Sequence, residues 1–169
     1  MNERAPLLVV DGYNLLHADP TYLRLAKTDI DVARRRLVDD VTVFAARRYE
    51  AVIVFDGSGP DLVWPPEVTV TWSGHGEADT IVEALAFEAR AQSRPCVVVT
   101  SDRATRDAVL GRGVETMRSA TMLEHLADSE AEWRESTGRS GGVPLADRLD
   151  PGTRTRLERW AKKRPGDRG

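Results

Sequence analysis

Aspartates stand at the ends of three short, apolar stretches of the sequence. They are Asp11 after residues 7–10, Asp56 after residues 51–55, and Asp102 after residues 96–100. Continuous apolar runs of this length are typical of buried strands in a parallel sheet. The carboxyl ends of parallel strands meet at one edge of a sheet, where ligands bind. We therefore expect these three carboxylates to converge.

Two further acids, Glu77 and Asp79, stand where a helix is expected to begin after a glycine-rich loop. A helix that starts beside the same edge would add them to the cluster. Converging carboxylates repel one another and raise one another's pKa, so a divalent cation is their natural partner. Oxygen ligands favour Mg²⁺ or Mn²⁺ over zinc. Such an ion activates water and neutralises charge at a phosphate, which predicts metal-assisted phosphoryl chemistry.

Each aspartate taken singly also has a structural explanation, because Asp is common in turns and helix caps. Other chemistries are less well supported. The sequence has no Gly-x-x-x-x-Gly-Lys-Ser/Thr loop, no Gly-x-Gly-x-x-Gly after its first strand, and no second acid close after Asp11 in the pattern Asp-x-Asp. The single cysteine, Cys96, excludes an intramolecular disulfide and a cysteine zinc cluster, which indicates a reducing, cytoplasmic location.

Strand and helix patterns alternate along the chain, which predicts an α/β fold with a mainly parallel sheet covered on both faces. We expect strands near residues 7–10, 51–55, 68–72, 96–100 and 114–117, and helices near 31–48, 78–91, 103–110 and 119–135. Residues 1–135 would form one domain. Residues 136–169 would form a linker and a basic C-terminal helix packed on the same domain.

The bulk composition is that of a soluble globular chain: 169 residues, 41% hydrophobic and 30% charged. No apolar run approaches the about 20 residues that a membrane helix needs, so no membrane partner is expected. The net charge of −3 lacks the basic excess of many nucleic-acid binders. Basic residues are nevertheless clustered at 34–36 and in the C-terminal segment 154–168. No residue pattern defines an oligomeric state.

Four stretches together resemble a known family. They are Leu-Val-Val-Asp-Gly-Tyr-Asn-Leu-Leu at 8–16, Val-Ile-Val-Phe-Asp at 52–56, Glu-Ala-Asp-Thr at 77–80 and Val-Val-Thr-Ser-Asp at 98–102. They resemble the YacP-like NYN domains, a branch of the PIN-like nucleases that includes ribosome-associated mRNA endonucleases. The basic segment at 154–163 is similar to that family's C-terminal segment. The resemblance implies a PIN-like three-layer α/β/α fold and cleavage of single-stranded RNA with Mg²⁺ or Mn²⁺.

Position by position, the resemblance implies that Asp11, Asp79 and Asp102 bind metal and that Asn14 supports them. Asp56 matches a strand-end acid, and Glu77 is a candidate ligand or a supporting residue. The class leaves a 5′-phosphate and a 3′-hydroxyl. The substrate would be single-stranded RNA, in particular mRNA, with the ribosome as a partner. The alternatives are a non-catalytic RNA- or ribosome-binding module of the same fold and a small-molecule phosphatase.

RNA that approaches an acidic edge needs basic or aromatic groups around it. The candidates are Arg34, Arg103, Tyr13, Arg159, Lys162 and Lys163. Each has an ordinary alternative. Arg34 could lie on a solvated helix face, and Arg103 could pair with Asp107 one turn on. Tyr13 could be core packing, and the C-terminal basic helix could be a soluble helix end.

Overall fold

The structure is a computed structural model that describes residues 4–139. Its centre is a five-stranded sheet in which every strand pair is parallel, with the order β3-β2-β1-β4-β5. The strands are β1 (Leu7–Asp11), β2 (Glu50–Phe55), β3 (Val68–Trp72), β4 (Cys96–Val99) and β5 (Val114–Met117). The α/β class and the five strands are confirmed, and the sheet is parallel throughout the described chain.

Strand β1 is the middle of the sheet, and all five of its residues are buried. Val10 lies opposite Ile53 of β2 on one side and Val99 of β4 on the other. A strand that is covered on both faces cannot alternate polar and apolar residues, which explains its unbroken apolar run. Asp11, the last residue of β1, therefore lies at the centre of the carboxyl edge of the sheet.

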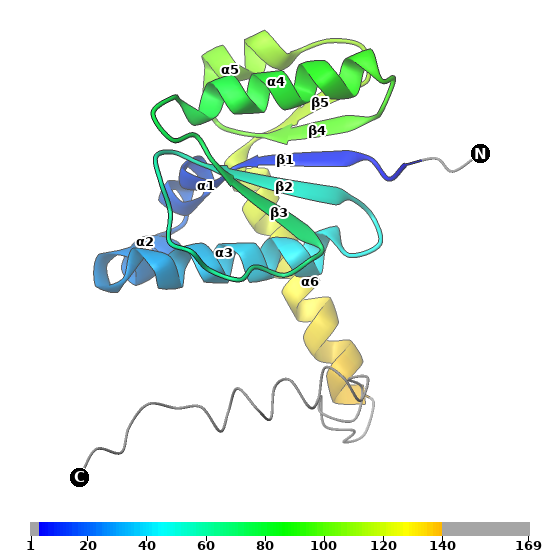
Figure 1. The fold of residues 1–169 in the computed structure, drawn as a ribbon. Helices are drawn as coiled ribbons and strands as arrows, with labels where there is room; N and C mark the ends of the chain where they lie inside the picture. The colour runs from blue at the N-terminus through cyan, green and yellow to red at the C-terminus, as the bar shows by residue number, and fades with distance from the viewer. Residues whose placement is uncertain (1–3, 140–169) are drawn as a thin grey trace. The chain divides into compact units, whose positions relative to one another are not determined.

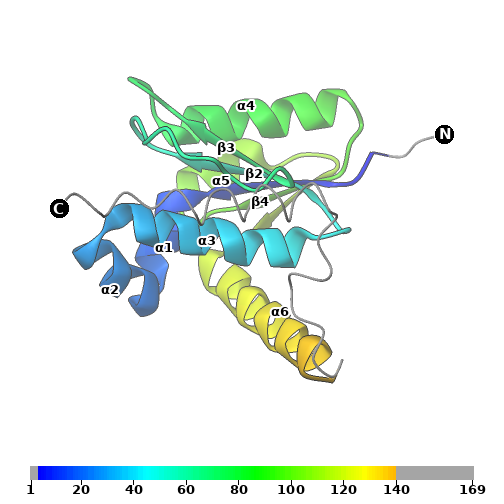
Figure 2. The ribbon, with the colours of Figure 1, turned by 60° about the horizontal axis from the view of Figure 1, so that its bottom comes forward.

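Helices cover both faces of the sheet, in the three-layer arrangement seen in Figures 1 and 2. Helices α4 (Ala78–Ala91) and α5 (Arg103–Val109) cover one face. The other face is covered by α1 (Gly12–Ala18), α2 (Pro20–Thr28), α3 (Ile30–Ala45) and the start of α6 (Ser119–Arg139). Each face has its own buried apolar cluster, so the sheet separates two cores.

Helices α1 and α2 were not expected from the sequence. Asp11 caps α1 by accepting the Asn14 N–H, and Asp19 caps α2 by accepting the N–H groups of Thr21 and Tyr22. Pro20 is the first residue of α2, where proline suits a helix because its missing N–H is not needed. The expected helix at 31–48 is α3, which ends earlier, at Ala45.

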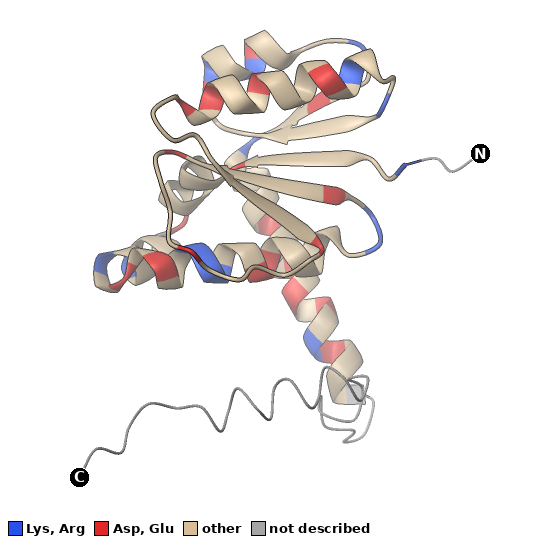
Figure 3. Cartoon of the chain, viewed as in Figure 1, with Lys and Arg blue, Asp and Glu red and all other residues tan. Residues whose placement is uncertain are grey.

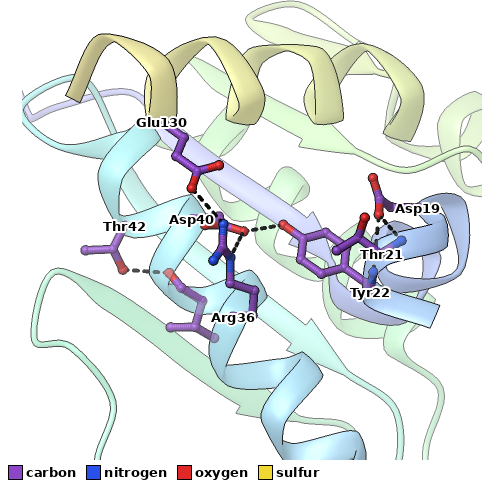
Figure 4. A network of polar contacts seen from close by, with 8 residues as sticks. Asp19, Thr21, Tyr22, Arg36, Asp40, Thr42 and Glu130 are labelled. Atoms are coloured by element: carbon purple, nitrogen blue, oxygen red, sulfur yellow. Dashed lines mark hydrogen bonds and ion pairs between the residues drawn. The ribbon is translucent and has the colours of Figure 1, made fainter. Parts of the chain in front are cut away.

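A network of polar contacts joins α2, α3 and α6, as Figure 4 shows. The Tyr22 hydroxyl donates to Asp40 at 2.7 Å, and Arg36 donates to Asp40 and to Glu130, both at 2.9 Å. Burial, with the neighbouring Asp40 carboxylate, raises the pKa of Tyr22 well above its usual value. The phenol therefore stays protonated and holds α2 against α3.

Contacts within the chain divide it into one unit that ends at Ala131 and another that starts at Glu132. Helix α6 runs on to Arg139, beyond the helix end that we expected near residue 135. Of the second unit the structure describes only the end of this helix. The expected basic helix, with Arg159, Lys162 and Lys163, lies outside the described residues, and the domain boundary at 135 stays a prediction. None of the helices described is long and apolar enough to span a membrane.

Candidate functional site

Three of the four candidate aspartates hold the start of a helix. Asp11 Oδ1 accepts the Asn14 N–H at the start of α1, at 3.1 Å. Asp102 Oδ2 accepts the Thr105 N–H at the start of α5, at 2.6 Å. Asp11 and Asp102 therefore do have the structural role of helix caps. Each such bond uses one carboxylate oxygen and leaves the other for a ligand.

Asp56 caps a helix that begins 22 residues later in the sequence. Its Oδ1 accepts the N–H of Ala78, the first residue of α4, at 2.6 Å. It also accepts a longer hydrogen bond, of 3.3 Å, from the Ser73 hydroxyl. Glu77 precedes α4, but its side chain makes no cap hydrogen bond. Asp56 thus ties the end of β2 to the helix turn that carries Asp79.

The other three aspartates act electrostatically on Asp11 at this edge. The pKa of Asp11 is raised from 3.8 to about 6, first because the residue is buried, with 8% exposed. The Asn14 N–H opposes this shift, while the charges of Asp79, Asp56 and Asp102 add to it. Figure 3 shows acidic positions at the edge where β1 and β2 end and α4 begins. About half of the Asp11 carboxyls are therefore protonated at pH 6, and about a tenth still are at pH 7.

Asp102 lies in a contrasting environment. The Thr105 N–H lowers its pKa, and the Thr105 hydroxyl adds to the effect. Asp102 is accordingly ionised at a pH where Asp11 still holds part of its proton. Glu77 is exposed and is not among the charges that shift the pKa of Asp11. Asp79, in the first turn of α4, is partly buried and is one of them.

The carboxylate oxygens of this edge are the donors that a hard divalent cation prefers. Within residues 4–139, however, no group of three or more His, Cys, Asp or Glu side chains is arranged so that it could hold a metal ion. The caps explain this spacing, because the carboxylates of Asp11, Asp56 and Asp102 turn toward helix starts. The donor chemistry fits Mg²⁺ or Mn²⁺.

Asn14 joins three segments at this edge. Its Oδ1 accepts the backbone N–H of Ser101 at 2.8 Å and the hydroxyl of Ser119 at 2.7 Å. Ser101 Oγ in turn accepts the Ser119 N–H at 3.1 Å. Ser119 was not predicted as a site residue. In the sequence it is only a small polar residue at an expected helix start. In the structure its buried hydroxyl donates to Asn14.

Arg34 and Tyr13 belong to a packed stack of aromatic rings. An Arg34 N–H group donates to the Tyr13 hydroxyl, and a second guanidinium nitrogen lies 2.5 Å from Asp31. The guanidinium carbon lies 4.9 Å from the centre of the Trp72 ring, 5.4 Å from Tyr13 and 6.0 Å from Phe55. Only 11% of the Arg34 side chain is exposed. Most of the Arg34 side chain is therefore covered by the stack, in which Tyr13 and Trp72 are half-buried and Phe55 is buried.

The glycine after Asp11 is required by this stack. A Cβ atom at Gly12 would lie 2.4 Å from the Phe55 ring, well inside the contact distance of two carbon atoms. Tyr13 meets the same ring edge-on, with 5.3 Å between ring centres. The Asp-Gly-Tyr-Asn segment thus lets α1 begin directly against the end of β2.

Arg103, the other candidate of the described chain, is almost fully exposed. Its Nε lies 3.7 Å from Asp107, with side-chain exposures of 87% and 66%. An exposed ion pair of this kind contributes little to stability because water and salt screen it. Arg103 follows Asp102 directly and is accessible to a ligand at the acidic edge.

The fold and the acidic edge together define a PIN-like α/β domain. The model of the YacP-like NYN domain family matches residues 8–162, and the chain belongs to that family. The structure resembles the crystal structure of Rae1 (YacP) from Bacillus subtilis, with 22% identity, a TM-score of 0.71, and coverage of 93% of this chain and 95% of that one. A crystal structure of a mutant form of that same Bacillus protein matches with 22% identity, a TM-score of 0.67, and coverage of 92% and 99%. No match was found among curated protein sequences.

Proposed function

We propose that this protein is a metal-dependent endoribonuclease that cleaves single-stranded RNA, in particular mRNA, in the cytoplasm. The observation that carries the proposal is the acidic edge, where burial raises the pKa of Asp11 to about 6 and the charges of three other aspartates add to the shift. A folded protein gains no stability from concentrating like charges around a buried carboxyl. Such an arrangement is typical of sites that use the charges for chemistry.

Mg²⁺ or Mn²⁺ is the proposed cofactor. Asp11, Asp79 and Asp102 would hold it, each through an oxygen that is not used in a helix cap or through a water, as Mg²⁺ often keeps several waters. When bound, the ion would supply a more acidic water and neutralise charge on the phosphodiester. Asp56 is proposed to support the site by fixing the start of α4 beside Asp79. Glu77, exposed in the same turn, is the least supported candidate ligand.

The residues of the chain would divide the remaining work. Asp11 holds part of its proton in the metal-free protein, where its pKa is about 6, and would release that proton to bind the cation as an ionised ligand. Arg103 and the Tyr13 hydroxyl would contact the RNA backbone, and Arg34 would fix Tyr13 from inside. Attack by water, rather than by the 2′-hydroxyl of the RNA, would leave a 5′-phosphate and a 3′-hydroxyl. Arg159, Lys162 and Lys163 would add contacts to RNA or to a ribosome.

A non-catalytic RNA- or ribosome-binding module of the same fold is the second candidate. One observation favours it: helix capping already provides Asp11, Asp56 and Asp102 with a structural role. Capping does not account for Asp79, which makes no cap hydrogen bond among the described residues and adds its charge to the surroundings of Asp11. The two candidates differ in turnover, so a cleavage assay separates them.

The test is cleavage of end-labelled single-stranded RNA with Mg²⁺ or Mn²⁺ by the full chain and by Asp11→Asn. We expect metal-dependent cutting that EDTA abolishes and that Asp11→Asn reduces by at least about 1,000-fold, since a metal site contributes several kcal/mol to the transition state. Asp128→Asn, an exposed acid on α6, is the matched control and should cut normally.

Cutting that survives Asp11→Asn would refute the proposed site. RNA binding without cutting, also in the presence of translating ribosomes, would favour the non-catalytic module. Hydrolysis of a generic phosphomonoester would instead indicate a phosphatase.

A further inference from the structure

We propose that Ser119 is a positioning residue of the acidic site, and that it acts by locking the Asn14 carboxamide with its oxygen turned into the protein. The side chain can then offer a ligand only its N–H groups. This inference rests on the proposed function for its effect on catalysis. The lock itself is a property of the folded chain and can be tested without turnover.

The contacts around Asn14 fix which way its amide faces. A backbone N–H can only donate, so the atom that faces the Ser101 N–H at 2.8 Å must be the Asn14 oxygen. The Ser119 hydroxyl, at 2.7 Å, uses the second acceptor position of that oxygen. A flipped amide would place its NH₂ group against the Ser101 N–H and lose that bond, and the Ser119 hydroxyl would have to accept instead of donate. The orientation therefore follows from the partners.

The lock also decides what Asn14 can do. An amide oxygen has two lone pairs, and here both are taken by protein donors. Asn14 is therefore unsuited to bind a cation through oxygen. Its nitrogen makes no hydrogen bond to another described residue, and the side chain is only partly buried. An N–H donor at this position suits a phosphate oxygen of RNA or the oxygen of a water.

Ser119 is placed to control two of the aspartates through this one amide. Ser119 holds the side chain of Asn14, and the backbone N–H of the same residue donates to the Asp11 carboxylate. Ser101, which is hydrogen-bonded to Asn14 and to the Ser119 N–H, is followed directly by Asp102. Ser119 is fully buried, so water cannot replace its hydroxyl without a rearrangement.

The first test measures the lock. In Ser119→Ala we expect the Ser101 amide to exchange its hydrogen about fivefold to tenfold faster, as the loss of one supporting hydrogen bond predicts. We also expect the side-chain NH₂ signals of Asn14 in an NMR spectrum to shift. The matched control is Ser129→Ala, which makes the same change on α6 at a residue whose hydroxyl contacts no partner among those described. Unchanged exchange and unchanged Asn14 signals in Ser119→Ala would overturn the proposal.

The second test measures the effect on catalysis, at a temperature where all variants are fully folded. Ser119→Ala should lower kcat for RNA cleavage roughly 10- to 100-fold, because small displacements of a catalytic group are costly. Asn14→Ala should lower kcat at least as much, and Ser119→Ala added to it should cause no further loss. A purely structural Ser119 would instead lower the melting temperature, leave kcat unchanged, and act independently of Asn14.

The two tests distinguish a failure of the proposed function from a failure of the positioning role of Ser119. A wild type that cuts no RNA, with a lock that Ser119→Ala releases, would refute the proposed function and leave the lock standing. A wild type that cuts RNA and a Ser119→Ala variant with full kcat would refute the positioning role alone.

Discussion

Asp11→Asn is expected to make the protein more stable at neutral pH while it removes activity. A pKa of about 6 in place of 3.8 means that the folded protein holds the Asp11 proton more tightly than the unfolded chain does. At 1.36 kcal/mol for each pH unit, ionising Asp11 in the folded state costs about 3 kcal/mol. Asparagine carries no charge and can still accept the Asn14 N–H, so the variant avoids that cost.

The pH dependence gives this prediction its sign. A raised pKa contributes stability that is fully present below pH 3.8 and is lost as the pH rises through about 6. The stability advantage of Asp11→Asn should therefore be small near pH 4, grow up to about pH 6, and be constant above it. At pH 8 it should reach about 3 kcal/mol, or roughly 6 to 12 °C in melting temperature for a chain of this size.

The assay is urea unfolding in EDTA between pH 4.5 and 8, followed by circular dichroism. Asp128→Asn serves as the control for the loss of an exposed negative charge and should change little at any pH. Mn²⁺ should raise the stability of the wild type at pH 8 and leave Asp11→Asn nearly unchanged. Equal stability of wild type and Asp11→Asn at pH 8, or a difference that does not vary with pH, would refute the electrostatic reasoning.

Two further predictions concern residues around the site. Arg34→Met should lower the free energy of unfolding by about 2 kcal/mol, since it removes a buried cation from three ring faces, whereas the exposed neighbour Arg35→Met should change little. Urea unfolding measures both, and equal losses would contradict the stacked role of Arg34. Asp56→Ala should cost about 1 kcal/mol through the lost cap on Ala78, while Asp56→Asn keeps an acceptor. Faster hydrogen exchange of the Ala78 amide in Asp56→Ala, but not in Asp56→Asn, would support the cap. Identical exchange of this amide in the two variants would exclude it.

The sheet and its acidic edge could be predicted because they depend on simple patterns. Buried parallel strands appear as short apolar runs, and an acid that directly follows such a run must emerge at the carboxyl edge. Helix α2 also had a readable signal, since Asp19 followed by Pro20 is a cap followed by a first-turn proline.

Other features depend on three-dimensional contacts that no local pattern records. Asp56 caps a helix that starts after a long loop, and Ser119 donates to Asn14 from the far end of the domain's sequence. Arg34 lies in a run of three arginines that resembles a solvated face. Its burial follows from Phe55 and Trp72, which stack at the ends of neighbouring strands with 5.1 Å between ring centres. Sequence patterns therefore placed these residues on their elements but could not show the contacts that they make.

The bond between Asn14 and Ser119 joins residues that are 105 positions apart, and this has a consequence for synthesis. A nascent chain exposes Asp11, Asp56, Asp79 and Asp102 before Ser119 has left the ribosome. Contacts between distant residues form only after the intervening chain is available. The site would therefore be completed only when most of the domain has emerged. With the proposed function, the protein would be unable to cut the message from which it is being translated until Ser119 has emerged and bonded to Asn14.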